Sequence, residues 1–279
     1  MAATETALIN GPAGKIELII DAPERVRGIA LVCHPHPLFH GSNTNKVAHT
    51  LARVFRDLGY AALRPNFRGV GKSEGSHDHG VAETDDMLAV ISWAQSRWGG
   101  MPLALGGFSF GGYVQTRVAA RLADGITPAE RIVLVGTAAG EVSGARSYPT
   151  LPVPDHSLVI HGEKDETVPL ANVLAWAEPQ ELPVIVVPGA DHFFHGRLHV
   201  IRKIIERRWD PLPQPPTAHR SPHETRRLPH QPLRPQDPRR PRRKGPPLRA
   251  RGGHPLARRH PGAGLQPPRQ GAGAGGRRR

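Results

Sequence analysis

The stretch Leu103-Ala-Leu-Gly-Gly-Phe-Ser-Phe-Gly-Gly112 joins a short apolar run to a segment compatible with a helix. Within it, 107–111 matches the pattern G-x-S-x-G, in which a sharp strand-to-helix turn lifts a serine hydroxyl above a sheet edge. The glycines beside Ser109 keep side chains out of that crowded turn. Five residues match such a pattern by chance fairly often, so a nucleophilic serine also needs partners elsewhere in the chain.

Charge divides the chain into two parts. The 279 residues carry a formal net charge of +13, but residues 211–279 hold 17 Lys and Arg against two acids. The same segment contains 16 of the 30 prolines. The remaining 20 basic and 22 acidic residues give 1–210 a net charge of −2. We therefore predict one domain over 1–210 and a disordered, basic tail rich in Pro, Arg and Gly over 211–279.

Composition also restricts the partners and the compartment. The tail has no aromatic residue and no basic helical stripe, so nucleic acid is not an expected partner beyond phosphate contacts of the tail alone. The single cysteine, Cys33, excludes an intramolecular disulfide and fits a reducing compartment. The start of the chain does not resemble a secretory signal, and no run approaches the ~18 apolar residues of a membrane span. We expect a cytoplasmic protein without a membrane partner.

Short apolar runs alternate with helix-like segments throughout 1–210. Strands are predicted at 15–20, 28–33, 60–64, 103–107, 131–135, 157–160 and 184–187, with a weak edge strand at 6–9. Helices are predicted at 45–58, 81–97, 112–123, 170–177 and 196–208, the first capped by Asn43 or Thr44. This alternation predicts an α/β fold, a mostly parallel, doubly wound sheet with helices on both faces. In such a sheet the ligand site lies at the carboxyl ends of the strands.

Two late predicted strands are followed by the groups that a nucleophilic serine needs. Asp165 follows the strand at 157–160, and His192 follows the strand at 184–187. The chain order Ser, Asp, His then places all three residues in loops at one edge of the sheet. We predict Ser109 as nucleophile, His192 as general base and Asp165 as the acid that orients the base.

Other side chains in the same loops offer alternatives. Glu163 or Glu166 could orient the base, but Asp165 precedes a predicted helix start at 167–169 that would hold its loop. His195 could act as the base, but it lies close to the last predicted helix, where a surface histidine is the commoner explanation. Structural roles are expected for two further residues, His161 (a hydrogen bond in its turn) and Asp191 (a cap).

The loop His34-Pro-His-Pro-Leu-Phe-His-Gly41 follows an early strand. Acyl transfer needs N–H donors aimed at the oxyanion, usually the amide after the nucleophile and one from this early loop. Phe110 supplies the first. The prolines of the loop have no N–H, so Leu38 is predicted as the second donor, with Phe39 behind it. The three histidines of the loop lack a matching set of acidic ligands, so we expect no metal and no cofactor.

The loop Asn66-Phe-Arg-Gly-Val-Gly-Lys-Ser73 ends like a phosphate-binding P-loop but lacks the first glycine of that motif. We predict a glycine-bearing loop beside the site, with Arg68 in a structural ion pair. The acids Glu83, Asp85 and Asp86 fall in the first turns of the next predicted helix. There they complement the helix dipole, and we interpret them as structural.

With these motifs in place, residues 6–209 resemble the α/β-hydrolase superfamily. More narrowly, they resemble compact bacterial serine hydrolases related to dienelactone hydrolases and the serine-aminopeptidase-like group. The resemblance implies the same three roles for Ser109, His192 and Asp165. Dienelactone hydrolases proper use a cysteine nucleophile, so their substrate is not implied here. The segment 138–156 is too short for a sizeable cap domain, which predicts an open cleft.

We therefore expect hydrolysis of a carboxylic ester or related small acyl compound through an acyl-enzyme. A peptidase or a thioesterase uses the same three residues, and the sequence does not choose between these leaving groups. A catalytically silent binding protein of the same fold is a further alternative, because a fold does not guarantee chemistry.

Overall fold

The computed structural model describes residues 3–125, 128–144 and 146–211. The predicted tail, 211–279, lies outside these residues except for its first position. Within the described part of the chain, no helix combines the length and the apolar character needed to cross a membrane.

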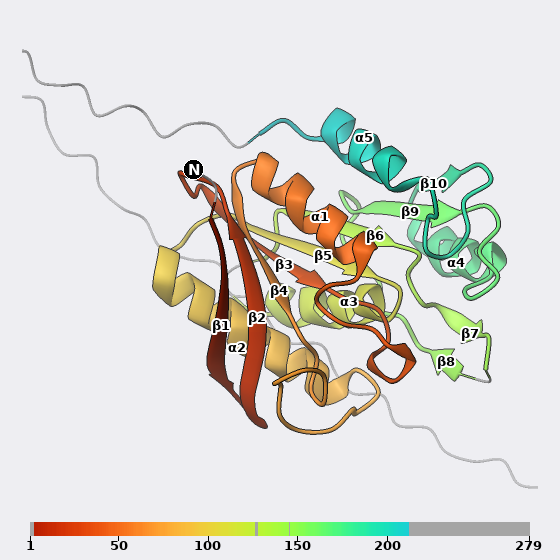
Figure 1. Cartoon of the computed structure of the whole chain (residues 1–279). Coiled ribbons are helices and arrows are strands. Elements are labelled where there is room, and N and C mark those ends of the chain that lie inside the picture. The colour runs from red at the N-terminus through yellow and green to blue at the C-terminus, as the bar shows by residue number, and fades with distance from the viewer. Residues whose placement is uncertain (1–2, 126–127, 145, 212–279) are drawn as a thin grey trace, which may run out of the picture. The chain divides into compact units, whose positions relative to one another are not determined.

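The domain is built on one eight-stranded sheet (Figure 1). Its order is β1 (Ala3–Gly11), β2 (Gly14–Ala22), β4 (Tyr60–Pro65), β3 (Gly28–Cys33), β5 (Leu103–Phe108), β6 (Arg131–Val135), β9 (Leu158–Gly162) and β10 (Val184–Val187). The pairs β1–β2 and β2–β4 are antiparallel, and all other neighbours are parallel. The mostly parallel α/β fold predicted from the sequence is confirmed, and the weak edge strand extends over nine residues as β1.

Helices cover both faces of the sheet. Over the part of the chain that the structure describes, the α-helices are α1 (Lys46–Asp57), α2 (Val81–Trp98), α3 (Phe110–Ala123), α4 (Leu170–Ala177) and α5 (Leu198–Arg208), with short 3₁₀ helices at Pro37–Phe39 (η1) and Glu178–Gln180 (η2). Figure 1 shows α1 and α5 together on one side and α2 and α3 on the other. The buried residues accordingly form two apolar clusters, one on each face. Strands β3, β4 and β5 are buried along their whole length, as expected for strands covered on both faces.

The cap of α1 differs from the prediction. Asn45, rather than Asn43 or Thr44, is the N-cap, and its side chain accepts the N–H groups of Val47 at 2.9 Å and Ala48 at 3.3 Å. Asn43 lies further from the helix start, and its N–H donates to Asn66 Oδ1 at 2.8 Å. The helix begins at Lys46, one residue later than predicted, so the cap moves to Asn45.

A small hairpin follows β6 that the sequence did not predict. It consists of β7 (Gly140–Val142) and β8 (Arg146–Tyr148), which form a separate two-stranded sheet. Strands of three residues are too short to show a periodic pattern. The hairpin lies within 138–156, where only a small excursion was expected, and it lies close to the residues of the candidate site.

Candidate active site

The turn between β5 and α3 holds Ser109 in a strained conformation. Its φ is 56° and its ψ is −119°, a region that residues other than glycine rarely adopt. Backbone hydrogen bonds hold it there, because the Ser109 N–H donates to the Val135 carbonyl at 3.0 Å. The Ser109 carbonyl accepts the N–H groups of Gly112 at 2.9 Å and Ala138 at 3.2 Å. The serine is therefore fixed at the carboxyl end of β5.

Two glycines give this turn the space that it needs. A Cβ on Gly111 would clash with the carbonyl oxygens of Cys33 and His34 at the end of β3. A Cβ on Gly107 would lie 2.5 Å from the carbonyl oxygen of Gly111. Only glycine allows the backbones to approach this closely. The glycines of the motif are thus required by packing between the turn and the neighbouring strand.

The structure brings Ser109, His192 and Asp165 into contact. His192 Nε2 lies 3.0 Å from Ser109 Oγ, and His192 Nδ1 lies 2.7 Å from Asp165 Oδ2. All three residues are buried, and the ring of Phe108 packs against the imidazole with centroids 5.0 Å apart. Because an ionised carboxylate only accepts hydrogen bonds, the contact assigns the proton to Nδ1 and leaves Nε2 free to accept from the serine hydroxyl.

The remaining oxygen of Asp165 is held by the backbone. Its Oδ1 accepts the N–H groups of Thr167 at 3.0 Å and Val168 at 2.8 Å. His161 closes the same turn, since its Nε2 lies 3.0 Å from the Val168 carbonyl oxygen and 3.5 Å from Asp165 Oδ2. Burial lowers the pKa of His161, with a smaller opposing effect of Asp165. The structural hydrogen bond predicted for His161 is confirmed. The structure also places His161 next to Asp165, which the sequence did not predict.

The alternative residues in these loops make other contacts. Glu163 is exposed and accepts the Gly189 N–H at 2.7 Å, and Glu166 is exposed. The His195 side chain is 74% exposed and pairs with Asp191 at 2.6 Å on the surface. Asp191 also accepts the His195 N–H at 3.0 Å. Neither glutamate nor His195 therefore reaches Ser109.

The histidine-rich loop is attached to the sheet through His34. The Nδ1–H of His34 donates to the Pro35 carbonyl at 2.7 Å, and its Nε2 accepts the Phe67 N–H at 3.0 Å. Burial lowers the pKa of His34 to about 4, so the ring is neutral at pH 7. Within the described residues, no three His, Cys, Asp or Glu side chains are arranged to hold a metal ion.

Among the described residues, one of the two N–H groups predicted to bind the oxyanion is free to donate and the other is already bonded. Phe110 is the first residue of α3, and its N–H donates to no acceptor within the described part of the chain. The Leu38 N–H already donates to His36 Nδ1 at 3.2 Å, and Leu38 is 68% exposed. The assignment of Leu38 is therefore not supported, because a side chain two residues earlier takes its amide.

A pocket of about 260 Å³ lies over Ser109 and His192. Its wall comes from the histidine-rich loop, the β7–β8 hairpin and the loops that follow β9 and β10. The lining residues are Pro35, His36, Phe39, Ser109, Ser143, Gly144, Arg146, Thr167, His192 and Phe193. The hairpin residues are the part of this site that sequence reasoning missed, since no motif marks them.

Three charged residues near the site have structural roles, as predicted. Arg68 forms a two-point ion pair with Asp86, with Nε–Oδ2 and Nη2–Oδ1 distances of 2.8 Å. Burial raises the pKa of Asp86, and Arg68 opposes that shift. Glu83 is fully buried and accepts the N–H groups of Asp78 and Gly80, each at 2.8 Å, at the start of α2. These contacts fix the loop that precedes α2.

Comparison with known proteins places this arrangement among hydrolases. A family model described as X-Pro dipeptidyl-peptidase (S15 family) matches residues 19–133. A solved structure from Xanthomonas campestris, described as an α/β serine hydrolase without lid, is 35% identical with a TM-score of 0.67. The match covers 76% of this chain and 97% of that one.

Two further relatives cover most of the domain. A structure described as an α/β serine hydrolase homologue from Coxiella burnetii is 38% identical, with a TM-score of 0.64, over 73% of this chain and 96% of that one. An uncharacterized protein of Rickettsia prowazekii is 31% identical over 205 residues, 70% of this chain and 84% of the relative.

Proposed function

Because this chain belongs to the α/β serine hydrolases, we propose that it cleaves a carboxylic ester of a small acyl compound through an acyl-enzyme. One observation carries the proposal: a single imidazole, His192, contacts the Ser109 hydroxyl at 3.0 Å and the Asp165 carboxylate at 2.7 Å. A serine is a weak nucleophile unless a base takes its proton as it attacks.

In the first step, Ser109 Oγ attacks the ester carbonyl while His192 Nε2 accepts the hydroxyl proton. The Asp165 carboxylate stabilises the imidazolium that forms. The tetrahedral intermediate then collapses, and His192 returns the proton to the leaving alcohol. In the second step, His192 takes a proton from water, which attacks the acyl-enzyme. His192 then returns that proton to Ser109 Oγ as the bond between Oγ and the acyl carbon breaks and the acid is released.

The oxyanion of both intermediates needs N–H donors. The Phe110 N–H, at the N-terminus of α3, is the first, and the helix dipole adds to it. For the second we propose the His36 N–H in place of Leu38. His36 lines the same pocket as Ser109, and its N–H has no acceptor within the described residues.

Two other activities would use the same residues. The match to a family model named for a peptidase supports amide cleavage as the second candidate. A thioesterase is a further alternative within the same mechanism. Purified protein assayed on matched esters, thioesters and aminoacyl amides distinguishes them, and we expect the esters to give the highest kcat/KM.

Replacement of the nucleophile tests the proposal. We expect Ser109→Ala to lower kcat/KM on 4-nitrophenyl acetate by at least about 10³-fold, and a fluorophosphonate probe to label the wild-type protein only. Ser157→Ala is the matched control. Ser157 directly precedes β9, and this variant should keep the wild-type kcat/KM and still be labelled by the probe. A wild-type protein that resists the probe would instead indicate a catalytically silent binding protein.

A further inference from the structure

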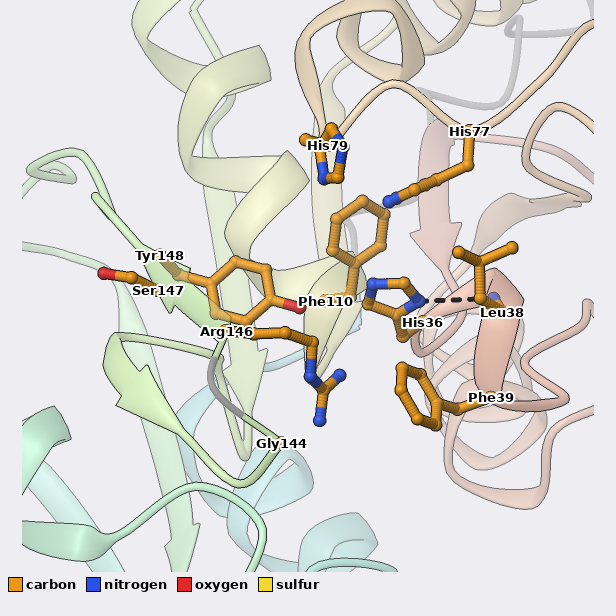
Figure 2. A pocket seen from close by; sticks show the side chains of 10 residues that line it. All are labelled: His36, Leu38, Phe39, His77, His79, Phe110, Gly144, Arg146, Ser147 and Tyr148. Atoms are coloured by element: carbon orange, nitrogen blue, oxygen red, sulfur yellow. Dashed lines mark hydrogen bonds between the residues drawn. The ribbon is translucent and has the colours of Figure 1, made fainter.

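The pocket over Ser109 continues into a larger chamber of about 460 Å³. Four residues line both spaces: His36, Phe39, Gly144 and Arg146. The chamber is otherwise lined by Leu38, His77, His79, Phe110, Ser147 and Tyr148. Figure 2 shows their side chains around a common space, with Arg146 entering from the β7–β8 hairpin. A substrate bound at Ser109 therefore has room to extend past Arg146.

Arg146 brings a positive charge to this space without an acidic partner. Its Nε and Nη2 donate to the Ser143 carbonyl at 3.2 and 2.7 Å, and its guanidinium lies 4.2 Å from the centre of the Phe39 ring. The Tyr148 hydroxyl is a side-chain hydrogen-bond partner of Arg146, and within the described residues no carboxylate lies within ion-pair distance of the guanidinium. The group is thus held in place by a carbonyl and an aromatic ring while part of it faces the cleft.

Two further polar groups of the chamber, the His36 imidazole and the Tyr148 hydroxyl, can also donate a hydrogen bond. Because the Leu38 N–H occupies Nδ1 of His36, the proton of the neutral ring is on Nε2, which faces the side of Tyr148 and Arg146 in Figure 2. Burial, together with smaller effects of the nearby His77 and Arg146, lowers the pKa of His36 to about 4. The ring is therefore neutral at pH 7, and the Tyr148 hydroxyl lies across from it.

The acid that contacts a lining histidine of the chamber, Glu83, lies outside the lining itself. Glu83 lies behind His77, with its Oε1 2.8 Å from His77 Nδ1. It is fully buried, and its oxygens also accept the N–H groups of Asp78 and Gly80. No Asp or Glu lines either the chamber or the pocket over Ser109. A cation and neutral donors facing a space without acids form a site for an anion.

We propose that Arg146 binds an anionic group on the substrate, so that the preferred esters carry a carboxylate or phosphate away from the scissile bond. The inference rests on the proposed ester hydrolysis and adds the substrate class. Arg146 is a specificity-determining residue here and takes no part in proton transfer.

Matched esters that differ only in charge test the proposal. On the acyl side, 4-nitrophenyl hydrogen adipate is compared with its neutral methyl ester. On the alcohol side, 4-acetoxybenzoate is compared with methyl 4-acetoxybenzoate, and 4-acetoxyphenyl phosphate supplies the phosphate arm. In at least one comparison we expect the wild-type kcat/KM to be about tenfold or more higher for the charged ester. That preference should decrease in 0.5 M NaCl, because salt screens partly exposed charges.

Variants distinguish the effect of Arg146 on the preference for charged esters from the effect of the protein's overall charge. Arg146→Gln should reduce the ratio of charged to neutral kcat/KM to near one, and Arg146→Lys should retain part of it. Arg121→Gln, which removes an exposed arginine paired with Asp85 on the surface, is the control and should keep the wild-type ratio. Thermal melting checks that each variant is folded.

Two results would overturn the anion site: equal rates for charged and neutral esters in the wild-type protein, or a preference that persists in Arg146→Gln. Both leave the ester hydrolase intact, since neutral esters are still cleaved and the fluorophosphonate still labels Ser109. If no ester is cleaved and no label is incorporated, the proposed function itself fails.

Discussion

Oδ2 of Asp165 lies 2.7 Å from Nδ1 of His192, and the other oxygen of the same carboxylate is held by two backbone N–H groups. The carboxylate therefore cannot rotate without losing those bonds. It presents one oxygen to the imidazole in a fixed direction, which in turn directs Nε2 to Ser109. The orientation of the base is thus set by the turn after β9.

Asp165→Asn should retain the fold and lose most of the activity. The amide oxygen can still accept the backbone N–H groups, but its NH₂ then faces His192 and favours the wrong tautomer. We expect kcat/KM on 4-nitrophenyl acetate to decrease by about 10³- to 10⁴-fold, with a small change in melting temperature. Asp155→Asn, an exposed acid, is the matched control. Activity within tenfold of wild type in Asp165→Asn would contradict the assigned role.

Gly111→Ala should destabilise the protein although it adds a helix-favouring residue to α3. Alanine normally stabilises a helix interior by about 1 kcal/mol relative to glycine. Here its Cβ would clash with the carbonyl oxygens of Cys33 and His34, and such overpacking costs about 1–3 kcal/mol or more. Urea unfolding should therefore show a loss of about 2 kcal/mol, together with reduced fluorophosphonate labelling.

Gly100→Ala provides the comparison for that measurement. A Cβ at Gly100 meets no atom within 4 Å, and its φ is not in the left-handed region. We expect its free energy of unfolding to stay within about 0.5 kcal/mol of wild type. Equal stabilities of the two variants would show that the close contact between α3 and β3 is absent.

Acid should destabilise the fold through His34. Burial lowers its pKa from an ordinary value of 6.5 to about 4. Between these values the unfolded chain binds a proton that the folded chain does not, so the free energy of unfolding falls as the pH is lowered. One such group changes the free energy of unfolding by up to about 1.4 kcal/mol per pH unit. The contribution of His34 to the free energy of unfolding is fully present above pH 6.5 and is lost progressively as the pH falls towards 4.

Urea unfolding of His34→Gln at pH 7, 6 and 5 measures this contribution. The stability difference between wild type and variant should shrink as the pH falls, because only the wild type loses the stability linked to His34. His199→Gln, at an exposed position, should follow the wild-type slope. An NMR titration that places the pKa of His34 near 6.5 would refute the prediction without depending on the variant.

Two details were not predicted correctly from the sequence: the cap of α1 and the second oxyanion donor in the loop 34–41. The helix itself follows from apolar residues on one face, but it begins at Lys46, one residue later than predicted, so that Asn45 is its cap. The sequence favours Leu38 as the second oxyanion donor because the prolines before it have no N–H. Its amide is instead taken by His36, an interaction that depends on the side-chain rotamer and not on the order of residues.

The sequence by itself determined the α/β fold, the strained turn at Ser109 and the edge of the sheet at which the site lies. These follow from periodicity, from glycines at fixed offsets and from the rule that parallel strands end at one edge. The sequence also favoured Asp165 and His192 over Glu163 and His195, but only the tertiary structure brings these two side chains into contact. Only the tertiary structure, too, shows that an unpredicted hairpin brings Arg146 to the pocket over Ser109. The reason is that periodicity describes neighbours a few residues apart. The bond between Ser109 and His192 joins residues 83 positions apart, and its length depends on how strands and loops pack.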